Sequence, residues 1–276
     1  MTDAPAEVVT LSIETPKGQE VWERTPDVVK EHLRQFGLAR PGFKLGLYGD
    51  MMLDDRPAAA QGQTIRYRQD PLHQYQAGTI YVMRHLPRRP GLQILDIGSP
   101  VETTITLCAY GEVTKLDIRP QAYRDAVMPF QSLTGSATQI PILDERADVV
   151  VSNCVLCHVG DGRYGDALDV DGDLHMLREC TRVVRPGGLI ILGLGPMGRQ
   201  AALLFNTHRV YSAEWAHRLV RWAGLKVLDL WVYAVGTGLW QSPDLMVEQG
   251  PSGGYYGFAT LMKPVVGTEQ HATPAC

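Results

Sequence analysis

Short apolar segments alternate with longer amphipathic segments through the middle of the chain, and few folds accommodate this order. The apolar runs predict strands buried on both faces, at residues 92–97, 113–117, 147–155 and 189–194. Residues 103–110 and 173–184, which lie between them, show helical periodicity. Strands that alternate with helices over short loops imply right-handed crossovers. We therefore expect an α/β fold with a doubly wound, mostly parallel sheet.

A helix and two further strands follow this region. Residues 212–224 begin with a serine N-cap, carry Glu214 in the first turn and end at a glycine, as helices commonly do. Residues 226–235 and 255–262 are apolar strands separated by a glycine-rich insert. The insert is long enough for the two strands to pair in an antiparallel manner at the sheet edge.

The N-terminal part of the chain lacks this alternation. A helix is expected at residues 26–36, before a stretch rich in glycine, proline and aspartate at residues 40–63. A second helix is expected at residues 71–86, which carry apolar side chains at helical spacing. We expect three parts, namely a cap or lid at residues 1–70, the main domain at residues 71–264 and a loose tail at residues 265–276.

Composition excludes several classes of function. The formal net charge is -4 and there is no basic run, so a nucleic-acid partner is not expected. No apolar stretch reaches the roughly 20 residues that cross a bilayer, and the N-terminus lacks the pattern of a signal peptide. The five cysteines are an odd number, which favours reduced thiols. These features predict a cytoplasmic protein without a membrane partner.

The first predicted strand and the next one end in acidic residues. Open α/β sheets bind ligands at the carboxyl ends of their strands, where the strand order reverses. Asp96 and Gly98 end the strand at residues 92–97, and Asp117 lies 21 residues after Asp96 at the tip of the next strand. This is close to the spacing of roughly 20 residues expected for a carboxylate that binds ribose hydroxyls. The alternative is that Asp117 only begins a turn.

Four features together carry a resemblance to one superfamily. They are Leu-Asp-Ile-Gly at residues 95–98, Asp117, Ala-Asp-Val-Val-Val-Ser-Asn at residues 147–153, and Arg-Pro-Gly-Gly at residues 185–188 before the next strand. Through them the chain resembles the S-adenosylmethionine (SAM) dependent methyltransferases with a Rossmann-like seven-stranded sheet, over roughly residues 75–262. The resemblance implies a fold with a final antiparallel strand pair and SAM as cofactor. We expect a small-molecule substrate.

A narrower resemblance rests on three further segments. They are His-Val-Gly-Asp-Gly-Arg-Tyr-Gly-Asp at residues 158–166, Asp-Val-Asp-Gly-Asp-Leu at residues 169–174 and Phe-Asn-Thr-His-Arg-Val at residues 205–210. They resemble an uncharacterised methyltransferase-like family often associated with sugar or polysaccharide genes. This family implies a fold and a cofactor class and names no substrate.

The cofactor loop departs from the wider superfamily. Pro100 and Glu102 stand where the second and third glycines of the usual loop would be, so the loop must follow a different path. Ser136 stands where many relatives have an acid that contacts the adenine amine. The residues expected to bind the cofactor are Asp96, Ile97, Gly98, Ser99, Pro100, Asp117, Ile118, Arg119, Ser136, Ala137, Asn153, Cys154 and Val155.

Two motifs suggest metals. Cys154, Cys157 and His158 match the haem attachment pattern, but they end a predicted buried strand and lack an obvious fourth metal ligand. Asp161, Asp166, Asp169, Asp171 and Asp173 do not match the calcium-loop template, although a magnesium site stays open. We expect no metal. Instead we expect Cys154 to line the cofactor pocket, and Asp173 to lie near a helix N-terminus, where the helix dipole favours it.

Candidate catalytic residues follow the strands. His158 and His208 titrate near neutral pH and could act as bases or as structural hydrogen-bonding groups. Tyr164 and Asp166 complete the catalytic candidates, and the substrate candidates are Tyr75, Arg163, Asn206 and Arg209. Tyr48, His73 and Tyr75 could instead close over the pocket.

We expect a methyltransferase that acts on a small polar molecule of the sugar or natural-product type. One alternative is an enzyme that cyclises SAM and releases methylthioadenosine. A second is a non-catalytic binding protein, and a nicotinamide-dependent enzyme is disfavoured by the missing second glycine and the terminal strand pair. The oligomeric state and the reacting atom do not follow from the sequence.

Overall fold

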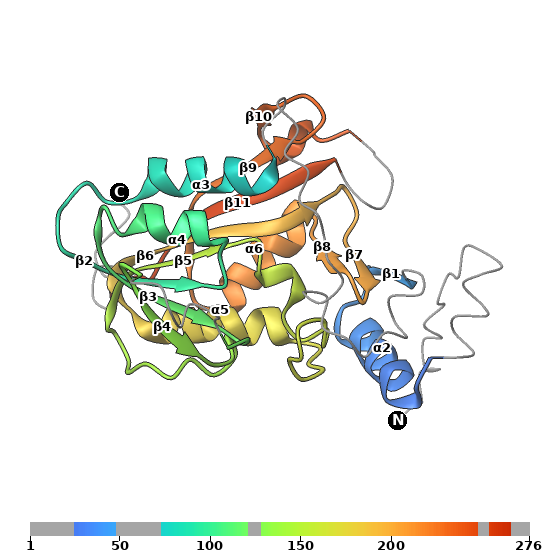
Figure 1. The fold of residues 1–276 in the computed structure, drawn as a ribbon. Coiled ribbons are helices and arrows are strands. Elements are labelled where there is room, and N and C mark those ends of the chain that lie inside the picture. The colour runs from blue at the N-terminus through green and yellow to red at the C-terminus, as the bar shows by residue number, and fades with distance from the viewer. Residues whose placement is uncertain (1–24, 48–72, 121–127, 248–253, 266–276) are drawn as a thin grey trace, which may run out of the picture.

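Eight strands of the computed structural model form one sheet with the order β10-β9-β11-β6-β5-β2-β3-β4 (Figure 1). The structure describes residues 25–47, 73–120, 128–247 and 254–265. In chain order the strands of this sheet are β2 (Leu92–Ile97), β3 (Gly111–Asp117), β4 (Gln131–Thr134), β5 (Ala147–Asn153), β6 (Val184–Met197), β9 (Lys226–Ala234), β10 (Leu239–Gln241) and β11 (Tyr255–Met262).

Most neighbouring strands in the sheet are parallel. This holds for the pairs from β4 through β3, β2 and β5 to β6. β11 lies between β6 and β9 and is antiparallel to both, and β10 forms a hairpin with β9 at the edge. The predicted doubly wound, mostly parallel α/β sheet with a C-terminal antiparallel strand pair is therefore confirmed. The strand order reverses between β2 and β5, which is where such sheets bind ligands.

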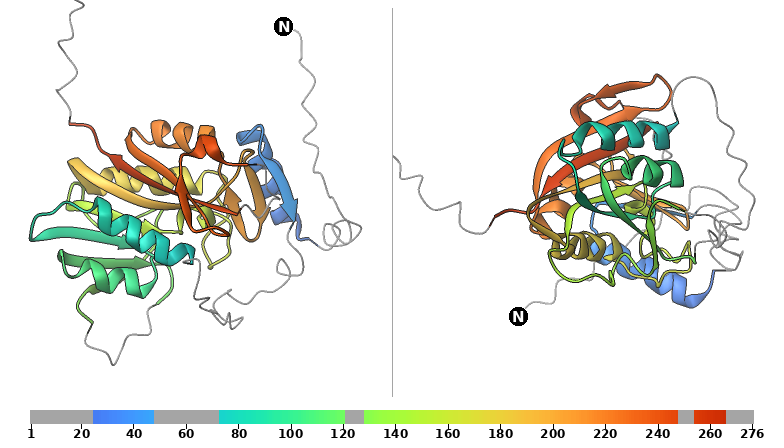
Figure 2. Two further views of the ribbon diagram at one scale, coloured as in Figure 1. Left: turned by 90° about the horizontal axis from the view of Figure 1, so that it is seen from above. Right: turned by 60° about the vertical axis from the view of Figure 1, so that its left-hand side comes forward.

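Helices cover both faces of the sheet, because side chains alternate between the faces along each strand. Val149 and Val151 of β5 belong to one apolar cluster, and Val150 belongs to the cluster on the other face. The helices on the first face are α3 (Gln74–His85) and α4 (Val101–Leu107), and those on the second are α5 (Gly172–Val183) and α6 (Ala213–Trp222) (Figures 1 and 2).

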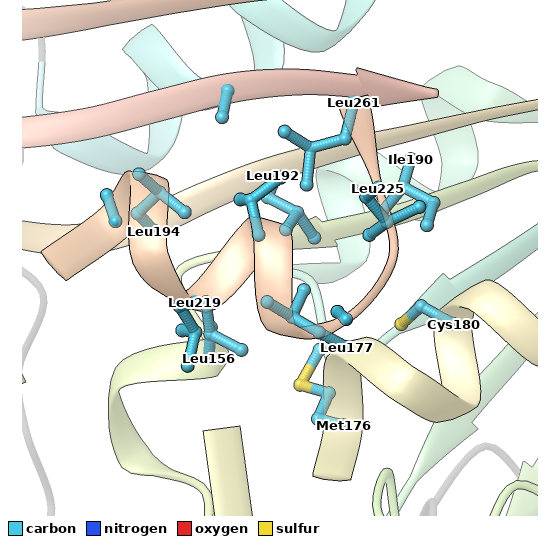
Figure 3. Close-up of a cluster of buried hydrophobic side chains, with 14 of the residues drawn as sticks. Leu156, Met176, Leu177, Cys180, Ile190, Leu192, Leu194, Leu219, Leu225 and Leu261 are labelled. Atoms are coloured by element: carbon cyan, nitrogen blue, oxygen red, sulfur yellow. The ribbon is translucent and has the colours of Figure 1, made fainter. Parts of the chain in front are cut away.

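The larger apolar cluster joins α5 and α6 to the sheet. Figure 3 shows Leu177 of α5 and Leu219 of α6 in one cluster with Leu192 of β6. All three side chains are buried, and complete burial of such a side chain contributes about 1.5–3 kcal/mol. This layer fixes β6 in the sheet, and with it the chain that continues beyond the carboxyl end of β6.

A small second sheet lies beyond that end (Figure 2). Tyr211, which directly follows its strand β8, forms a parallel bridge with Met197 at the end of β6. Phe36 packs against the sheet in a cluster with Leu203 and Phe205. The elements of this unit are α2 (Asp27–Ala39), β1 (Lys44–Leu47), β7 (Ala202–Phe205) and β8 (His208–Val210), in which β1 is parallel and β8 antiparallel to β7.

Several elements differ from the sequence prediction. The first helix continues to Ala39, and α3 begins at Gln74 because His73 caps it. The short strands β1, β4, β7, β8 and β10 were not predicted. Residues 1–24, 48–70 and 266–276 of the expected cap and tail, Tyr48 among them, lie outside the described residues. Within the described ranges no helix is long and apolar enough to cross a membrane.

Candidate functional site

Asp96 lies inside the fold, beneath the loop that follows β2. Its buried carboxylate accepts a hydrogen bond from Thr104 Oγ1 at 2.5 Å and lies 3.5 Å from Lys115 Nζ. Burial raises the pKa of Asp96, although the ammonium group of Lys115 opposes this. Lys115 Nζ also donates to the backbone carbonyl of Ser99. Thr104 and Lys115, which the sequence prediction did not include, therefore support the loop together with Asp96.

The loop after β2 lacks the second and third glycines of the superfamily pattern. It continues directly into α4. Gly98 has a φ of 60°, and a Cβ atom there would lie 2.9 Å from Val155 Cγ2. Ser99 Oγ accepts a hydrogen bond from the backbone N–H of Asn153 at 3.0 Å. Pro100 is the N-cap of α4, so the helix begins where the family pattern has its second glycine. The carbonyl of Ile97 accepts from Ser152 Oγ, which ties β2 to β5.

Asp117 stands at the carboxyl end of β3 and is held by Arg119. The Arg119 backbone N–H and Nε donate to one carboxylate oxygen, at 3.0 and 3.1 Å, and Nη2 donates to the other at 3.1 Å. Burial by itself would raise the pKa of Asp117, but the bonds from Arg119 outweigh it and lower the pKa. The guanidinium of Arg119 also lies over the ring of Tyr164, 5.1 Å from its centroid. Half-buried Ile118 separates the two residues of this ion pair in sequence.

The loop after β4 carries the two residues expected near the adenine. Ser136 Oγ is 2.8 Å from Thr138 Oγ1 and accepts from the Thr138 backbone N–H at 3.2 Å. Ala137 packs against the larger apolar cluster. Both residues follow a strand adjacent to β3, at the same edge of the sheet as Asp117.

Asn153 and Cys154 end β5 in the middle of this edge. Asn153 Nδ2 donates to the carbonyl of Tyr75 at 3.0 Å, which joins β5 to the start of α3. The buried Oδ1 atom of Asn153 has no hydrogen-bond partner among the described residues. Cys154 is buried with a φ of 64°. Burial raises the pKa of Tyr75 and of Tyr256, and the nearby thiol of Cys154 adds to both shifts. Tyr256 had not been identified from the sequence.

The segment after β5 begins with the 3₁₀ turn η3 (Leu156–His158) and lies at the carboxyl edge of the sheet. His158 Nδ1 is 2.6 Å from the carbonyl of Thr207, so this nitrogen carries the proton of the bond. The ring of Tyr164 stands edge-on to His158 at 5.5 Å. Asp166 accepts from the backbone N–H groups of Gly160 and Tyr164, at 2.6 and 3.3 Å, and so shapes the loop.

The turn between β7 and β8 lies against this loop. Arg163 Nη1 donates to the carbonyl of Asn206 at 2.7 Å, and the rings of His158 and His208 are 6.3 Å apart. Burial lowers the pKa of His158 to about 3 and that of His208 to about 4, and the charge of Arg163 acts in the same direction on both. Four buried polar atoms have no hydrogen-bond partner within the described part of the chain, namely Arg163 Nε, Asn206 Oδ1, Thr207 Oγ1 and His208 Nε2.

Arg209 follows these residues but faces the interior. Its guanidinium donates to the carbonyl of Val159 at 2.6 Å and lies 3.0 Å from Asp161. Asp173 accepts two hydrogen bonds from Arg40 of α2 and lies 3.9 Å from Arg209. Arg209 has no exposed surface, unlike the substrate contact that the sequence suggested.

The same network accounts for the ends of the acidic run. Asp161 and Asp173 face Arg209, and Asp171 lies 3.0 Å from Arg40. No group of three or more metal-type side chains occurs among residues 25–47, 73–120, 128–247 and 254–265. Cys154 and Cys157 are free, buried thiols, and burial raises the pKa of each.

Comparison with known families gives one match. The model described as "Caenorhabditis protein of unknown function, DUF268" matches residues 97–226, somewhat less than half of the chain. This span contains the three segments of the narrower resemblance. No curated protein matches the sequence.

Solved structures match most of the chain. The [4+2]-cyclase SpnF has a TM-score of 0.50 at 16% identity, over 69% of this chain and 81% of its own. A methyltransferase candidate from Bacillus halodurans C-125 has a TM-score of 0.51 at 12% identity, over 68% and 100%. The 1,6-didemethyltoxoflavin-N1-methyltransferase from Burkholderia thailandensis, solved with 1,6-didemethyltoxoflavin and S-adenosylhomocysteine, has a TM-score of 0.50 at 13% identity, over 96% and 94%. The chain therefore has the Rossmann-like fold of the SAM-dependent methyltransferases.

Proposed function

We propose that the chain is a SAM-dependent methyltransferase that acts on a small polar molecule of the sugar or natural-product type. The observation that carries the proposal is the buried carboxylate of Asp117 at the carboxyl end of β3, beside the reversal of strand order. A carboxylate at this point of a doubly wound sheet is suited to the hydroxyls of a ribose. The neighbour from Burkholderia thailandensis, which binds S-adenosylhomocysteine and a small molecule, supports the same assignment.

The residues at this edge fit the cofactor. Asp117 would accept the ribose hydroxyls in place of the Arg119 side chain, which is 41% exposed, while the Arg119 backbone N–H keeps its bond to the carboxylate. The loop from Gly98 to Pro100 and the unpaired Oδ1 of Asn153 would hold the methionine part, and Ser136 the adenine. When bound, SAM supplies a methyl group on a positively charged sulfur.

The acceptor would lie over the turn between β7 and β8. A buried polar atom without a partner costs roughly 1–3 kcal/mol, and four such atoms at one place are explained by a ligand that pairs with them. Arg163 Nε donates, Asn206 Oδ1 accepts, and Thr207 Oγ1 can do both. A hydroxyl group also donates and accepts, so this mixture favours a hydroxylated molecule.

His208 is the base of the proposed reaction. Its ring is neutral above about pH 4, and Nε2 is buried without a partner among the described residues. His158 is less suited, because burial lowers its pKa to about 3, further than that of His208, and makes it the weaker base. The acceptor oxygen would bond to the methyl carbon as the carbon–sulfur bond breaks, and its proton would pass to His208 Nε2. The remaining product is S-adenosylhomocysteine.

Calorimetry with SAM tests the cofactor assignment. Asp117→Ala should weaken SAM binding by about 1.5–3 kcal/mol, the scale of charge-assisted hydrogen bonds. Asp144→Ala is the matched control, because Asp144 is 73% exposed and its ion-pair partner among the described residues is Arg182. Absence of SAM binding by the wild-type chain would favour the non-catalytic alternative. Equal affinity of a folded Asp117→Ala variant would remove Asp117 from the site.

Cyclisation of SAM is the second candidate, favoured by two observations. SpnF, a [4+2]-cyclase, shows that this fold also houses a reaction other than methyl transfer, and Pro100 gives the cofactor loop a path of its own. Mass spectrometry of a reaction with SAM separates the candidates, because methyl transfer leaves S-adenosylhomocysteine and cyclisation leaves methylthioadenosine.

A further inference from the structure

A cavity of about 160 Å³ lies on the α3 face of the sheet, over the β9–β10 hairpin. In Figure 1, β10 stands at the opposite side of the sheet from β3 and β4. The strands β11, β6 and β5 separate β9 from β2, so this cavity shares no residue with the candidate cofactor site. The residues that line it are Tyr81, Arg84, His85, Asp229, Trp231 and Trp240.

The aromatic walls are fixed by packing. Tyr81 is buried, and its hydroxyl lies 3.1 Å from Thr260 Oγ1 of β11. The Tyr81 ring stacks on His85 with centroids 4.1 Å apart and on Trp240 with centroids 5.8 Å apart. Trp240 pairs with Tyr233 across the hairpin, which places both side chains on the α3 face with Trp231, two residues before Tyr233.

Asp229 holds two of the lining side chains. Trp231 Nε1 donates to one of its oxygens at 2.6 Å, and His85 Nε2 lies 2.7 Å from the other. Trp231 is nevertheless 40% exposed. The indole ring of Trp231 is thus open to solvent while its hydrogen bond to Asp229 holds it in place. Because the ring is already ordered, a ligand that stacks on it loses less entropy.

Arg84 provides the guanidinium group of the cavity. Its side chain is exposed and, within the described residues, forms no hydrogen bond or ion pair. The carboxylate of Asp229, in contrast, already interacts with His85 and Trp231. The oxygens of Asp229 are therefore occupied, whereas the guanidinium of Arg84 is left to bind an acceptor or an anion through two parallel N–H groups.

We propose that this cavity is a second ligand site, which binds a planar aromatic ring that carries a carboxylate. The volume is close to that of a cavity known to hold one benzene ring, about 150 Å³. The ring would stack between Trp231 and Trp240, and the carboxylate would pair with Arg84. An organic cation is disfavoured because Arg84 would repel it and both oxygens of Asp229 already interact with Trp231 and His85.

Three probes titrated into the full chain by calorimetry or ligand-observed NMR test this site. Benzoate should bind, whereas benzamide, which has the same shape without the charge, and cyclohexanecarboxylate, which lacks the aromatic ring, should each bind about tenfold more weakly. Tenfold corresponds to about 1.4 kcal/mol, within the range of a charge-assisted hydrogen bond.

Variants connect the binding to the named residues. Arg84→Gln and Trp231→Leu should each weaken benzoate binding about tenfold. Arg88→Gln, in the turn after α3, and Trp222→Leu, on α6, are matched exposed controls and should bind benzoate as the wild type does. Circular dichroism verifies the fold of each variant. No benzoate binding at millimolar concentration, equal binding of benzamide, or unchanged binding by a folded Arg84→Gln variant would each overturn the proposal. SAM binding is independent of these outcomes.

Discussion

Replacing Asp173 with asparagine tests how the small sheet and α2 are anchored to the main sheet. The Asp173 carboxylate is buried and accepts hydrogen bonds from Arg40 at 3.1 and 2.5 Å and from the Tyr211 hydroxyl at 3.0 Å. Arg209 lies 3.9 Å away. Burial would raise the pKa of Asp173, but the two arginines outweigh it and lower the pKa, so the group is ionised at neutral pH. Asparagine keeps the shape of the side chain and removes the charge.

The structure sets the expected magnitude. Removing one partner of a buried ion pair costs roughly 3–5 kcal/mol, because the remaining charge stays buried without compensation. Here each arginine keeps one other carboxylate: Arg209 keeps Asp161 at 3.0 Å, and Arg40 keeps the partly exposed Asp171 at 3.0 Å. We therefore expect the lower end of the range, a loss of about 3 kcal/mol in the free energy of unfolding.

Urea unfolding at neutral pH measures this loss as a shift of the midpoint at a constant m-value. Asp144→Asn is the control, because its pair with Arg182 is exposed and should change stability by about 0–1 kcal/mol. A loss below about 1 kcal/mol for Asp173→Asn, with an unchanged m-value, would show that the buried ion pairs do not hold the unit in place.

Two further predictions concern the histidines. With an acceptor found by screening hydroxylated small molecules, His208→Ala should lower turnover by about 10²–10⁴-fold with little loss of stability. His158→Ala should instead lower the melting temperature. Normal turnover of a folded His208→Ala variant would exclude His208 as the base. Burial lowers the pKa of His32 and His208 to about 4 and that of His158 to about 3. Between pH 6.5 and 4 the unfolded chain therefore binds more protons than the folded chain, and the free energy of unfolding falls as the pH is lowered. Each histidine changes the free energy of unfolding by up to about 1.4 kcal/mol per pH unit. Burial raises the pKa of Asp161 to about 7, so its proton uptake in the folded chain offsets the contribution of one histidine. A free energy of unfolding that does not change with pH in urea titrations would contradict the burial of these rings.

The parts of the fold that the sequence predicts are those with a long periodic pattern. The apolar run of β2 has the predicted bounds, and Ser212 caps α6 by accepting from the Trp215 backbone N–H. The strands β1, β7 and β8 have three or four residues each, too few to show a period. β1 also pairs with β7, which lies far away in the sequence. Tertiary packing determines this pairing, and the local sequence does not.

The position of a candidate site residue was predictable where a strand end determines it. Asp117 could be placed by its spacing from Asp96, because parallel strands bring their carboxyl ends to one edge. The supporting role of Lys115 could not be assigned in this way, although a lysine within an apolar strand, two residues before an acid, is a signal that could have been used. Its ammonium group is buried because it meets Asp96 and the Ser99 carbonyl, partners on other elements.

Strand alternation explains why His208 and its neighbour Arg209 differ. Successive side chains of β8 point to opposite sides, so the sequence segment that carries both cannot place both in one site. Arg209 points to Asp161 and Asp173, where its charge is compensated, and it also binds the Val159 carbonyl. His208 points toward His158 and leaves Nε2 without a partner in the described part of the chain. The hairpin thus separates an anchored side, which stabilises the loop after β5, from a side whose buried polar atoms lack partners among the described residues, where we propose that the acceptor binds.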